Sequence, residues 1–259
     1  MEHDRQSRLN LDFWASGNYV KDYAGGGLRS PESMLFALHR DDLAGRVLEL
    51  GCGAGRVTGH LIEHARTVDA VDISPVMVAH CRREYPGASY SVGDLRDLSG
   101  FESGSFEAVV APFCVLDVFD DAERRRVLDE IGRVLVADGL LIASTHNLGY
   151  APHIPKPSRI FARSPLRMAV NLVRMPRRVR NSRSLRDLQR AESNHAILLD
   201  EGHEYSLLHY YISRDAQARQ FLEHGFELEM CLDLDGESVG PGDDRAGCPE
   251  LHYSARRAG

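Results

Sequence analysis

Three glycines at alternate positions follow a short apolar run at 47–50 and could form a ligand-binding turn: Gly51, Gly53 and Gly55. Glycine lets the backbone turn sharply and approach a ligand without a Cβ atom in the way. The spacing is not the G-x-G-x-x-G pattern of dinucleotide-binding proteins, because Arg56 stands at the sixth position. Glu49 adds a carboxylate beside the turn, which suits an ammonium group better than a pyrophosphate. The turn therefore favours a ligand other than NAD.

Two further acids follow later apolar runs. Asp72 ends the run at 67–73, and a carboxylate there can accept hydrogen bonds from both hydroxyls of a ribose. Asp94, in Gly93-Asp94-Leu95, follows the run at 88–92 and can meet an adenine amino group. The carboxyl ends of parallel strands meet at one edge of a sheet, so we expect both acids to lie near the glycine turn.

The elements that must position these residues alternate regularly. Strands are expected at 46–50, 67–73, 88–92, 106–111 and 140–144. Helices are expected at 57–64, at 76–84 and from 120 or 121 to 136. This alternation predicts an α/β fold with a doubly wound, mostly parallel sheet that helices cover on both faces.

The rhythm changes after Tyr150. Five prolines between 151 and 200 predict an insertion of short helices. Beyond it we expect, in order, a strand at 205–213, a helix at 214–224, a strand at 226–234 and a short edge strand at 251–254.

Residues 46–144 resemble the class I S-adenosylmethionine-dependent methyltransferases, of the type that tailors small natural products. The matching motifs keep the family's order: VLELGCGAG at 47–55, VDAVDIS at 68–74, GDL at 93–95, FEAVVAPFCVLDVF at 106–119 and RVLVADGLLIAS at 133–144. The resemblance implies a seven-stranded Rossmann-like sheet. It further implies a helical N-terminal cap at 1–43 and a methyltransferase domain at 44–259, with a helical lid at about 151–200.

The same resemblance assigns roles to individual residues. It implies S-adenosylmethionine as cofactor and S-adenosylhomocysteine as product. Glu49 and the three glycines would hold the methionine part, Asp72 the ribose, and Phe113 would lie near the methionine end. Ile73 and Met77 would flank the adenine, and Asp94 with Leu95 would meet its edge. From the cap, Trp14 and Tyr19 would fold over the cofactor.

The acceptor end is less specified. A general base is needed only if the acceptor must lose a proton. Candidates are His146 and Asn147 after the fifth strand, His209 in the later strand, and Tyr23, which can close the site or orient the acceptor. Pro112-Phe113-Cys114 replaces the Asn-Pro-Pro-aromatic motif of nucleic-acid and protein-amide methyltransferases, which favours a small molecule with an O, N or activated carbon acceptor. An aromatic or peptide-derived bacterial secondary metabolite, such as an indole, fits this description.

An arginine-rich stretch separates Asp138 from Asp187. It holds nine arginines and Lys156 but no Asp or Glu. One interpretation is an RNA or tRNA methyltransferase that uses this stretch as a clamp. Another is a basic amphipathic surface for an anionic membrane. We favour a lid with a solvated charged face, because a formal net charge of −7 argues against a dedicated nucleic-acid binder.

Composition sets the remaining expectations. The chain has 259 residues with 43% hydrophobic and 27% charged residues, which is typical of a globular protein. The polar N-terminus and the absence of a long apolar run favour a cytoplasmic protein without a transmembrane segment. Five widely spaced cysteines and scattered histidines predict neither disulfides nor a metal site. A homodimer, a dehydrogenase and a non-catalytic cofactor-binding regulator stay open as alternatives.

Overall fold

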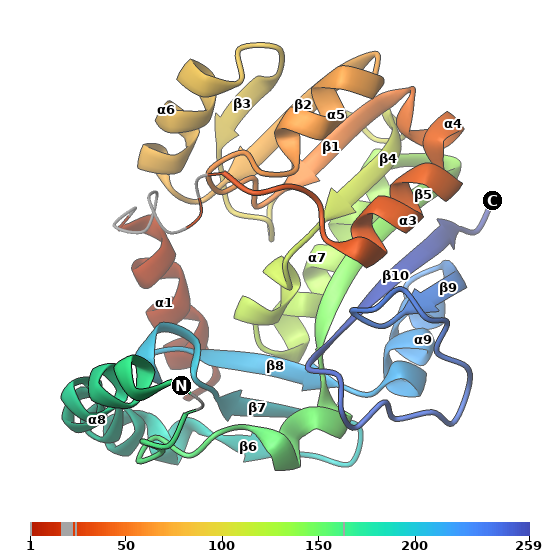
Figure 1. Ribbon diagram of the computed structural model, residues 1–259. Coiled ribbons are helices and arrows are strands. Elements are labelled where there is room, and N and C mark those ends of the chain that lie inside the picture. The colour runs from red at the N-terminus through yellow and green to blue at the C-terminus, as the bar shows by residue number, and fades with distance from the viewer. Residues whose placement is uncertain (1, 17–22, 24, 163) are drawn as a thin grey trace.

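The computed structural model describes residues 2–16, 23, 25–162 and 164–259. Its centre is a parallel sheet, in which five strands lie in the order β3-β2-β1-β4-β5 (Figure 1). Their bounds are β1 Arg46–Leu50, β2 Thr67–Asp72, β3 Ser89–Val92, β4 Phe106–Ala111 and β5 Leu135–Asn147. All neighbours along this path pair in parallel. The predicted mostly parallel α/β fold is therefore confirmed.

The C-terminal strands complete the sheet in an order that the sequence did not reveal. Strand β10 (Glu250–Arg257) pairs antiparallel with β5 on one side and with β9 (Phe226–Leu232) on the other. The expectation of a short edge strand at 251–254 is therefore wrong. Leu251, Tyr253 and Ala255 are fully buried, and a strand with such a buried face gains most between two neighbours. Seven strands in the order β3-β2-β1-β4-β5-β10-β9 form the Rossmann-like sheet.

Helices cover both faces because the strand residues alternate. Val47, Ala108 and Ile142 pack beneath three helices: α3 (Ser30–Leu38), α4 (Arg40–Leu43) and α5 (Thr58–His64). The neighbouring residues Leu48, Val109 and Leu141 pack on the opposite face, against α7 (Asp121–Val134) and α9 (Arg214–Glu223). Helix α6 (Pro75–Glu84) lies beside β2 and β3, and α1 (Glu2–Ala15) lies apart from α3 (Figure 1).

Helix starts follow the local chemistry. Asp120 is the N-cap of α7: its carboxylate accepts a hydrogen bond from the Glu123 backbone N–H at 3.0 Å, in a capping box. Ser74 is the N-cap of α6, and Pro75 follows it in the first turn, where its fixed φ costs nothing. These caps fix where the chain leaves the sheet edge.

The insertion differs from the expected run of short helices. It contains a 3-10 turn η2 (Leu148–His153), one 21-residue helix α8 (Pro165–Leu185) and a second 3-10 turn η3 (Arg186–Leu188). Two antiparallel strands follow, β6 (Arg190–Ala191) and β7 (His195–Leu199). Strand β7 is an apolar run whose members are mostly buried, in a stretch that was expected to be helical.

Strand β8 (Leu208–Ile212) joins this extension to the main sheet. It pairs antiparallel with β7 and in parallel with the last two residues of β5, so that His146 lies opposite Tyr211. The predicted strand started earlier, but His203, Glu204 and Tyr205 have positive φ, in the turn η4 (Gly202–Glu204) and just after it. The end of strand β5 thus pairs with β8, whereas its preceding residues pair with β4. Strand β8 faces the carboxyl edge of the parallel sheet (Figure 1). None of the helices in the described parts of the chain is long and apolar enough to cross a bilayer.

Candidate active site

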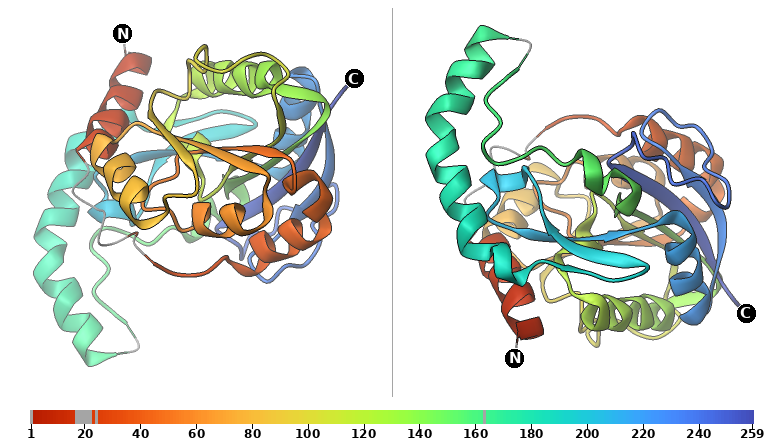
Figure 2. Two further views of the ribbon diagram at one scale, coloured as in Figure 1. Left: turned by 90° about the horizontal axis from the view of Figure 1, so that it is seen from above. Right: turned by 90° about the horizontal axis from the view of Figure 1, so that it is seen from below.

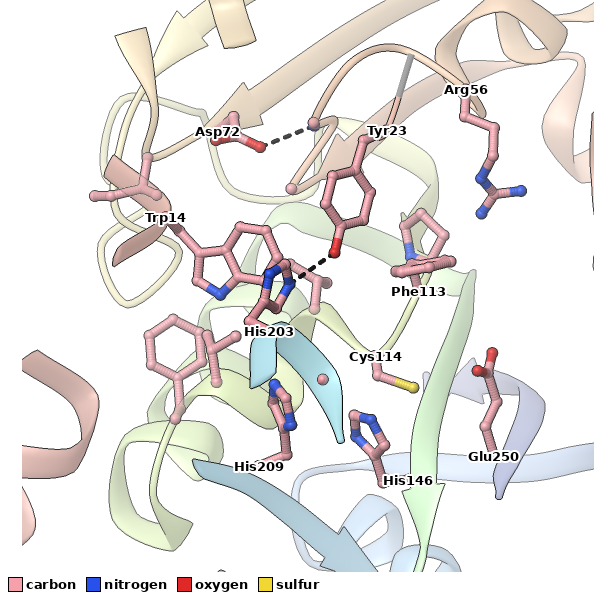
Figure 3. A pocket seen from close by; sticks show the side chains of 18 of the residues that line it. Trp14, Tyr23, Arg56, Asp72, Phe113, Cys114, His146, His203, His209 and Glu250 are labelled. Carbon is pink, nitrogen blue, oxygen red and sulfur yellow. Dashed lines mark hydrogen bonds between the residues drawn. The ribbon is translucent and has the colours of Figure 1, made fainter. Parts of the chain in front are cut away.

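A cavity of about 530 Å³ lies between the carboxyl edge of the parallel sheet and strand β8. Asp72 lies toward one end of it and His146 and His209 toward the other (Figure 3). The cavity brings together these residues expected from the sequence: Trp14, Tyr23, Glu49, Gly51, Gly53, Asp72, Ile73, Met77, Asp94, Leu95, Phe113, His146 and His209. Its size is within the range of small-molecule sites.

The turn after β1 is held by the neighbouring strand. The backbone N–H groups of Gly51 and Cys52 both donate to the Val71 carbonyl, at 2.7 and 3.2 Å. Gly51 has φ +67°, and a Cβ atom built on it would lie 2.2 Å from a Val115 methyl. Glycine is required at this position for conformation and for space. Together with Glu49, Gly53 and Asp72, Gly51 forms what we call the glycine-loop end of the cavity.

Asp72 ties the turn to the start of α6. Its Oδ2 accepts a hydrogen bond from the Gly53 N–H and its Oδ1 from the Ser74 N–H, both at 2.8 Å. Figure 3 shows one of these bonds as a dashed line at Asp72. Burial raises the pKa of Asp72, and the two backbone hydrogen bonds oppose this rise. Each carboxylate oxygen retains capacity for a second hydrogen bond. The carboxylate can therefore accept hydrogen bonds from a diol in the cavity.

Glu49 is buried beneath the turn. It is 1% exposed, and its Oε2 accepts a hydrogen bond from the Thr58 hydroxyl at 2.5 Å. Burial raises the pKa of Glu49 to about 8. The charge of the nearby Arg56 opposes this rise only in part, because its guanidinium makes a bidentate pair with Glu32, at 2.5 and 2.7 Å. A buried carboxyl group of this kind fits a ligand that carries a cationic ammonium group.

Asp94 lines the cavity, and its carboxylate also has a partner within the chain. Its carboxylate is paired with Arg96, whose Nη2 lies 2.6 Å from Oδ2 and whose backbone N–H donates to Oδ1. These bonds lower the pKa of Asp94 against the effect of burial, and they leave fewer acceptor sites for a ligand. Ile73, Met77 and Leu95 also line the cavity and give it an apolar wall.

Phe113 reaches the cavity from a strained turn after β4. Phe113 and Cys114 have φ of +56° and +55°, and the Cys114 N–H donates to Ser144 Oγ at 2.8 Å. Such conformations cost about 1–3 kcal/mol each and persist only where the surroundings hold them. The Arg29 guanidinium lies 4.3 Å from the centre of the Phe113 ring, and the ring projects toward the cavity (Figure 3).

An aromatic cluster occupies the middle of the cavity. Trp14, Tyr23 and His203 lie between the two ends (Figure 3), and the Tyr23 hydroxyl is 2.9 Å from His203 Nε2. The Trp14 ring meets His203 edge-on at 5.0 Å, and the Tyr23 ring meets Phe113 edge-on at 5.8 Å. This cluster gives the cavity faces and edges that suit a planar ring.

His146 is oriented by a buried acid. Asp117, in the 3-10 turn η1 (Val115–Val118), is fully buried, and its Oδ2 accepts hydrogen bonds from His146 Nδ1 at 2.8 Å and from the His146 backbone N–H at 2.6 Å. Arg124 pairs with the other carboxylate oxygen. Asp117 raises the pKa of His146 despite the effect of burial.

His209 forms a second acid–histidine pair. Its Nδ1 lies 2.6 Å from Asp200 Oδ2, which also accepts a hydrogen bond from the Tyr211 hydroxyl at 2.9 Å. His209 holds the pKa of Asp200 well below its usual range, although burial acts the other way. The rings of His146 and His209 stack at 4.8 Å with 18° between their planes. We call these two pairs, with Asp117 and Asp200, the histidine end.

The histidine end can take up a proton. Because each Nδ1 is hydrogen-bonded to a carboxylate, Nε2 is the nitrogen left to a ligand. Among the residues that the structure describes, two groups have the spacing of metal ligands: Cys114 with Asp117 and His146, and His146 with Asp200 and His209. Their carboxylates already accept hydrogen bonds from these imidazoles, so we interpret both groups as acid–histidine pairs.

Two predicted residues lie outside the cavity lining, and a third is not among the described residues. The Asn147 side chain is outside the cavity lining: its amide donates to the carbonyls of Asp244, Arg245 and Cys248, which fixes the loop before β10. Gly55 is also outside, and a Cβ atom there would lie 2.4 Å from the Tyr85 ring, so its smallness serves packing. Tyr19 lies outside the described residues.

Sequence reasoning missed Asp117, Asp200 and His203. Two of them did carry a signal, because a single acid within or directly after an apolar run is costly to bury without a partner. Asp117 stands within Val115–Val118, and Asp200 follows β7. His203 had no such signal, since the turn around it is set by tertiary contacts.

Comparison with known proteins places the glycine-loop end in a family. Residues 47–139 match the family model described as "Methyltransferase domain". The Ubiquinone biosynthesis O-methyltransferase of Xanthomonas oryzae is 31% identical over 123 residues, which cover 46% of this chain and 50% of that protein. The Magnesium-protoporphyrin O-methyltransferase of Rhodobacter capsulatus is 35% identical over 99 residues, or 36% and 42% of the two chains. The chain thus spans about half the length of the curated relatives it matches.

Solved structures extend the likeness of fold to the whole chain. The 1,6-didemethyltoxoflavin-N1-methyltransferase of Burkholderia thailandensis, solved with S-adenosylhomocysteine, superimposes with a TM-score of 0.61 at 15% identity, covering 100% of this chain and 91% of that one. An S-adenosylmethionine-dependent methyltransferase of Mesorhizobium loti gives a TM-score of 0.57 at 20% identity, covering 88% and 98%. These likenesses concern the fold.

Proposed function

Because the chain belongs to the class I S-adenosylmethionine-dependent methyltransferases, we propose that it methylates a hydroxyl oxygen of a small aromatic molecule. The observation that carries the choice of oxygen is the pair of acid-oriented imidazoles at the histidine end. A phenol becomes a strong nucleophile only as its proton leaves, so a base at this place serves an oxygen acceptor. An activated carbon, as in an indole, needs little such help.

The glycine-loop end fits the cofactor. Asp72 would accept hydrogen bonds from the ribose hydroxyls, and buried Glu49 would pair with the ammonium of the methionine part. Gly51 leaves the backbone open to close approach. The apolar wall of Ile73 and Met77 suits the adenine ring. When bound, S-adenosylmethionine supplies an electrophilic methyl group on its sulfonium.

The chain's own residues then have to position the acceptor and accept its proton. Phe113, Tyr23, Trp14 and His203 surround the middle of the cavity and would hold a planar ring by stacking and edge contacts. His146 or His209 would take the hydroxyl proton at Nε2, while Asp117 and Asp200 stabilise the resulting imidazolium. Alignment of the oxygen with the methyl group would contribute through proximity.

The acceptor class that we propose is a phenol-bearing secondary metabolite, aromatic or peptide-derived. Two relatives that match part of the chain are named as O-methyltransferases, which supports an oxygen acceptor. The RNA alternative relied on the arginine-rich insertion. Helix α8, which carries most of its arginines, contributes nothing to the described lining of the cavity.

The test is a methyl-transfer assay with matched acceptors. The purified chain is incubated with S-adenosylmethionine and with phenols, the corresponding anilines, indoles or bulk tRNA, and products are identified by mass spectrometry. We expect S-adenosylhomocysteine release and a methyl ether with one or more phenols. Methylation of tRNA, or of indoles and anilines with no phenol accepted, would overturn the oxygen assignment.

A further inference from the structure

Helix α8 is an element that the proposed function does not use. It runs along the outside of the molecule in both views of Figure 2, and its N-terminal end extends beyond the rest of the body. None of the described residues of this 21-residue helix is buried. Helices in proteins gain most of their stability from packing of an apolar face, so a partner that covers α8 would stabilise it.

One exposed face of α8 is apolar in its N-terminal half and cationic in its C-terminal half. Leu166, Val170, Val173, Arg177 and Arg180 are spaced by four, three, four and three residues, which places them in one stripe. The first three are apolar and exposed: Leu166 is 75% and Val173 80% exposed to solvent. The last two are arginines. We call this stripe the α8 face.

Further exposed apolar side chains and further arginines lie around the α8 face. Phe161, just before the helix, is 80% exposed, and Leu172 is exposed beside the stripe. Arg167 and Arg183 are exposed too, and the helix contains six arginines and no acidic residue. A cationic helix with unburied aliphatic and aromatic side chains matches a surface that offers both negative charge and hydrocarbon.

The C-terminal half of α8 is anchored beside the cavity. Glu204 in η4 forms ion pairs with Arg177 at 3.0 Å and with Arg174 at 3.5 Å, and its carbonyl accepts a hydrogen bond from Asn181. The adjoining His203 lines the cavity. A surface bound by α8 would therefore lie next to the cavity rim.

We propose that the α8 face binds the surface of an anionic phospholipid bilayer, with the apolar N-terminal half inserted among the acyl chains and the arginines on the lipid phosphates. RNA would use the arginines but would gain nothing from exposed Leu166 and Val173. A second copy of the helix would place like charges against each other. The rest of the chain is acidic, with a net charge of −7 overall, so an anionic surface attracts this face and repels the remainder.

The test is flotation of the full chain with lipid vesicles. Vesicles of phosphatidylcholine are compared with vesicles that also contain about one third phosphatidylglycerol, a composition chosen to give a strongly negative surface. We expect the chain to float with the anionic vesicles only, and to be released by about 1 M salt, where the Debye length falls to about 3 Å.

Two variants separate the charged from the apolar residues of α8. Arg180→Gln, in the α8 face, combined with Arg183→Gln, exposed beside it, should weaken binding by roughly 25-fold, at about fivefold per arginine near an anionic surface. Leu166→Ser with Val173→Ser should weaken binding by roughly tenfold or more through lost insertion. The matched controls are Arg40→Gln, an arginine 82% exposed on α4, and Leu222→Ser, a leucine 70% exposed on α9. Both controls should bind as the wild type does.

Several outcomes would overturn the proposal. These are no flotation with anionic vesicles, equal flotation with neutral ones, or equal losses in the control variants. A gel shift with tRNA that needs Arg180 and Arg183, without vesicle binding, would assign the helix to RNA. Self-association that needs Leu166 and Val173, without vesicle binding, would assign it to a second copy. Methyl transfer is not measured, so failure here leaves the proposed function untouched.

Discussion

The two ends of the cavity hold their functional groups in different ways. At the glycine-loop end, Asp72 and the turn after β1 are fixed by backbone N–H groups that lie within one βαβ unit. At the histidine end, the imidazoles of His146 and His209 are fixed by acidic side chains from other parts of the chain. The family model covers 47–139 and so contains the first end but neither histidine of the second.

This difference suggests a division of roles: the glycine-loop end depends on the shared fold, and the histidine end depends on features outside the matched family model. A turn built from backbone depends on a few glycines and one acid close in sequence. A base held by a carboxylate side chain from another element depends on how β5 meets η1 and how β7 meets β8. We therefore expect substitutions at the glycine-loop end to affect cofactor binding for any acceptor, and those at the histidine end to affect turnover alone.

The largest expected effect is on turnover at the histidine end. Substituting the base, by His209→Gln or His146→Gln, should lower kcat/KM for a phenol by about 100- to 10,000-fold, since general base catalysis contributes that much. The affinity for S-adenosylhomocysteine should stay within about twofold. Steady-state kinetics with calorimetry measures both, with His64→Gln as a surface control.

The pH profile sharpens this prediction. Because Asp117 raises the pKa of His146, kcat/KM should climb with pH through a value above 6.5 if His146 is the base. Asp117→Asn should shift that limb to lower pH. If neither histidine variant lowers turnover, the reaction needs no imidazole base and an oxygen acceptor loses its main support.

The next largest effect concerns the support of Asp117. Arg124 is fully buried and bonds Asp117, Gln217 and Gln220. Arg124→Met would leave a buried carboxylate without its cation and should lower the free energy of unfolding by about 3–5 kcal/mol. Its neighbour Arg125, which pairs with Asp121 nearer the surface, is the control.

For Arg125→Met we expect a loss of about 1 kcal/mol or less, because exposed ion pairs contribute little. Urea denaturation of both variants measures the difference. Equal losses would mean that the network around Asp117 does not hold the histidine end together.

The contrast between local patterns and contacts between separate elements also explains which parts of the structure the sequence predicted. The glycines, Asp72 and the alternation of strands and helices are local patterns, and they predict the sheet and the glycine-loop end. The pairing of β8 with the last two residues of β5 joins segments about sixty residues apart, and no local pattern specifies it. The stacking of His146 on His209 could therefore not be predicted from the sequence. The inner place of β10 likewise depends on its pairing with β5, about a hundred residues earlier in the chain.

Prolines misled the reading of the insertion for a physical reason. Proline breaks a helix in its interior but is accommodated in its first turn. Pro165 opens α8 at such a position, whereas Pro176 stands inside the helix, which continues past it although one backbone hydrogen bond is lost. The long helix therefore forms where short ones were expected.

A smaller effect is expected from crowding the glycine turn. Gly51→Ala should lower the free energy of unfolding by roughly 1–3 kcal/mol more than Gly53→Ala, because overpacking against Val115 adds to the strain that both share. At Gly53 a Cβ atom would meet nothing closer than 4.0 Å. Thermal unfolding compares the two, and Val115→Ala should partly rescue Gly51→Ala. Similar stabilities of the two glycine variants would contradict the packing account.

The smallest effect is a pH dependence at Glu49. Its pKa of about 8 in the free chain should fall when a ligand ammonium binds beside it, so binding releases a proton below pH 8. Affinity for S-adenosylhomocysteine should therefore rise with pH, by roughly tenfold between pH 7 and 8.5, and then level off. Glu49→Gln should flatten the curve in calorimetric titrations. If the wild-type affinity did not change over this pH range, the ligand ammonium would not bind beside Glu49.

The central claim is that one cavity has a cofactor end and a separate acceptor end. Calorimetric titration with S-adenosylhomocysteine tests it most directly in the wild type, Asp72→Ala and His209→Gln. We predict that Asp72→Ala loses about 1.5–3 kcal/mol of binding free energy through the lost charged hydrogen bonds, whereas His209→Gln binds as the wild type does. Unchanged affinity in Asp72→Ala, an equal loss in His209→Gln, or binding of NAD in place of S-adenosylhomocysteine would contradict the account.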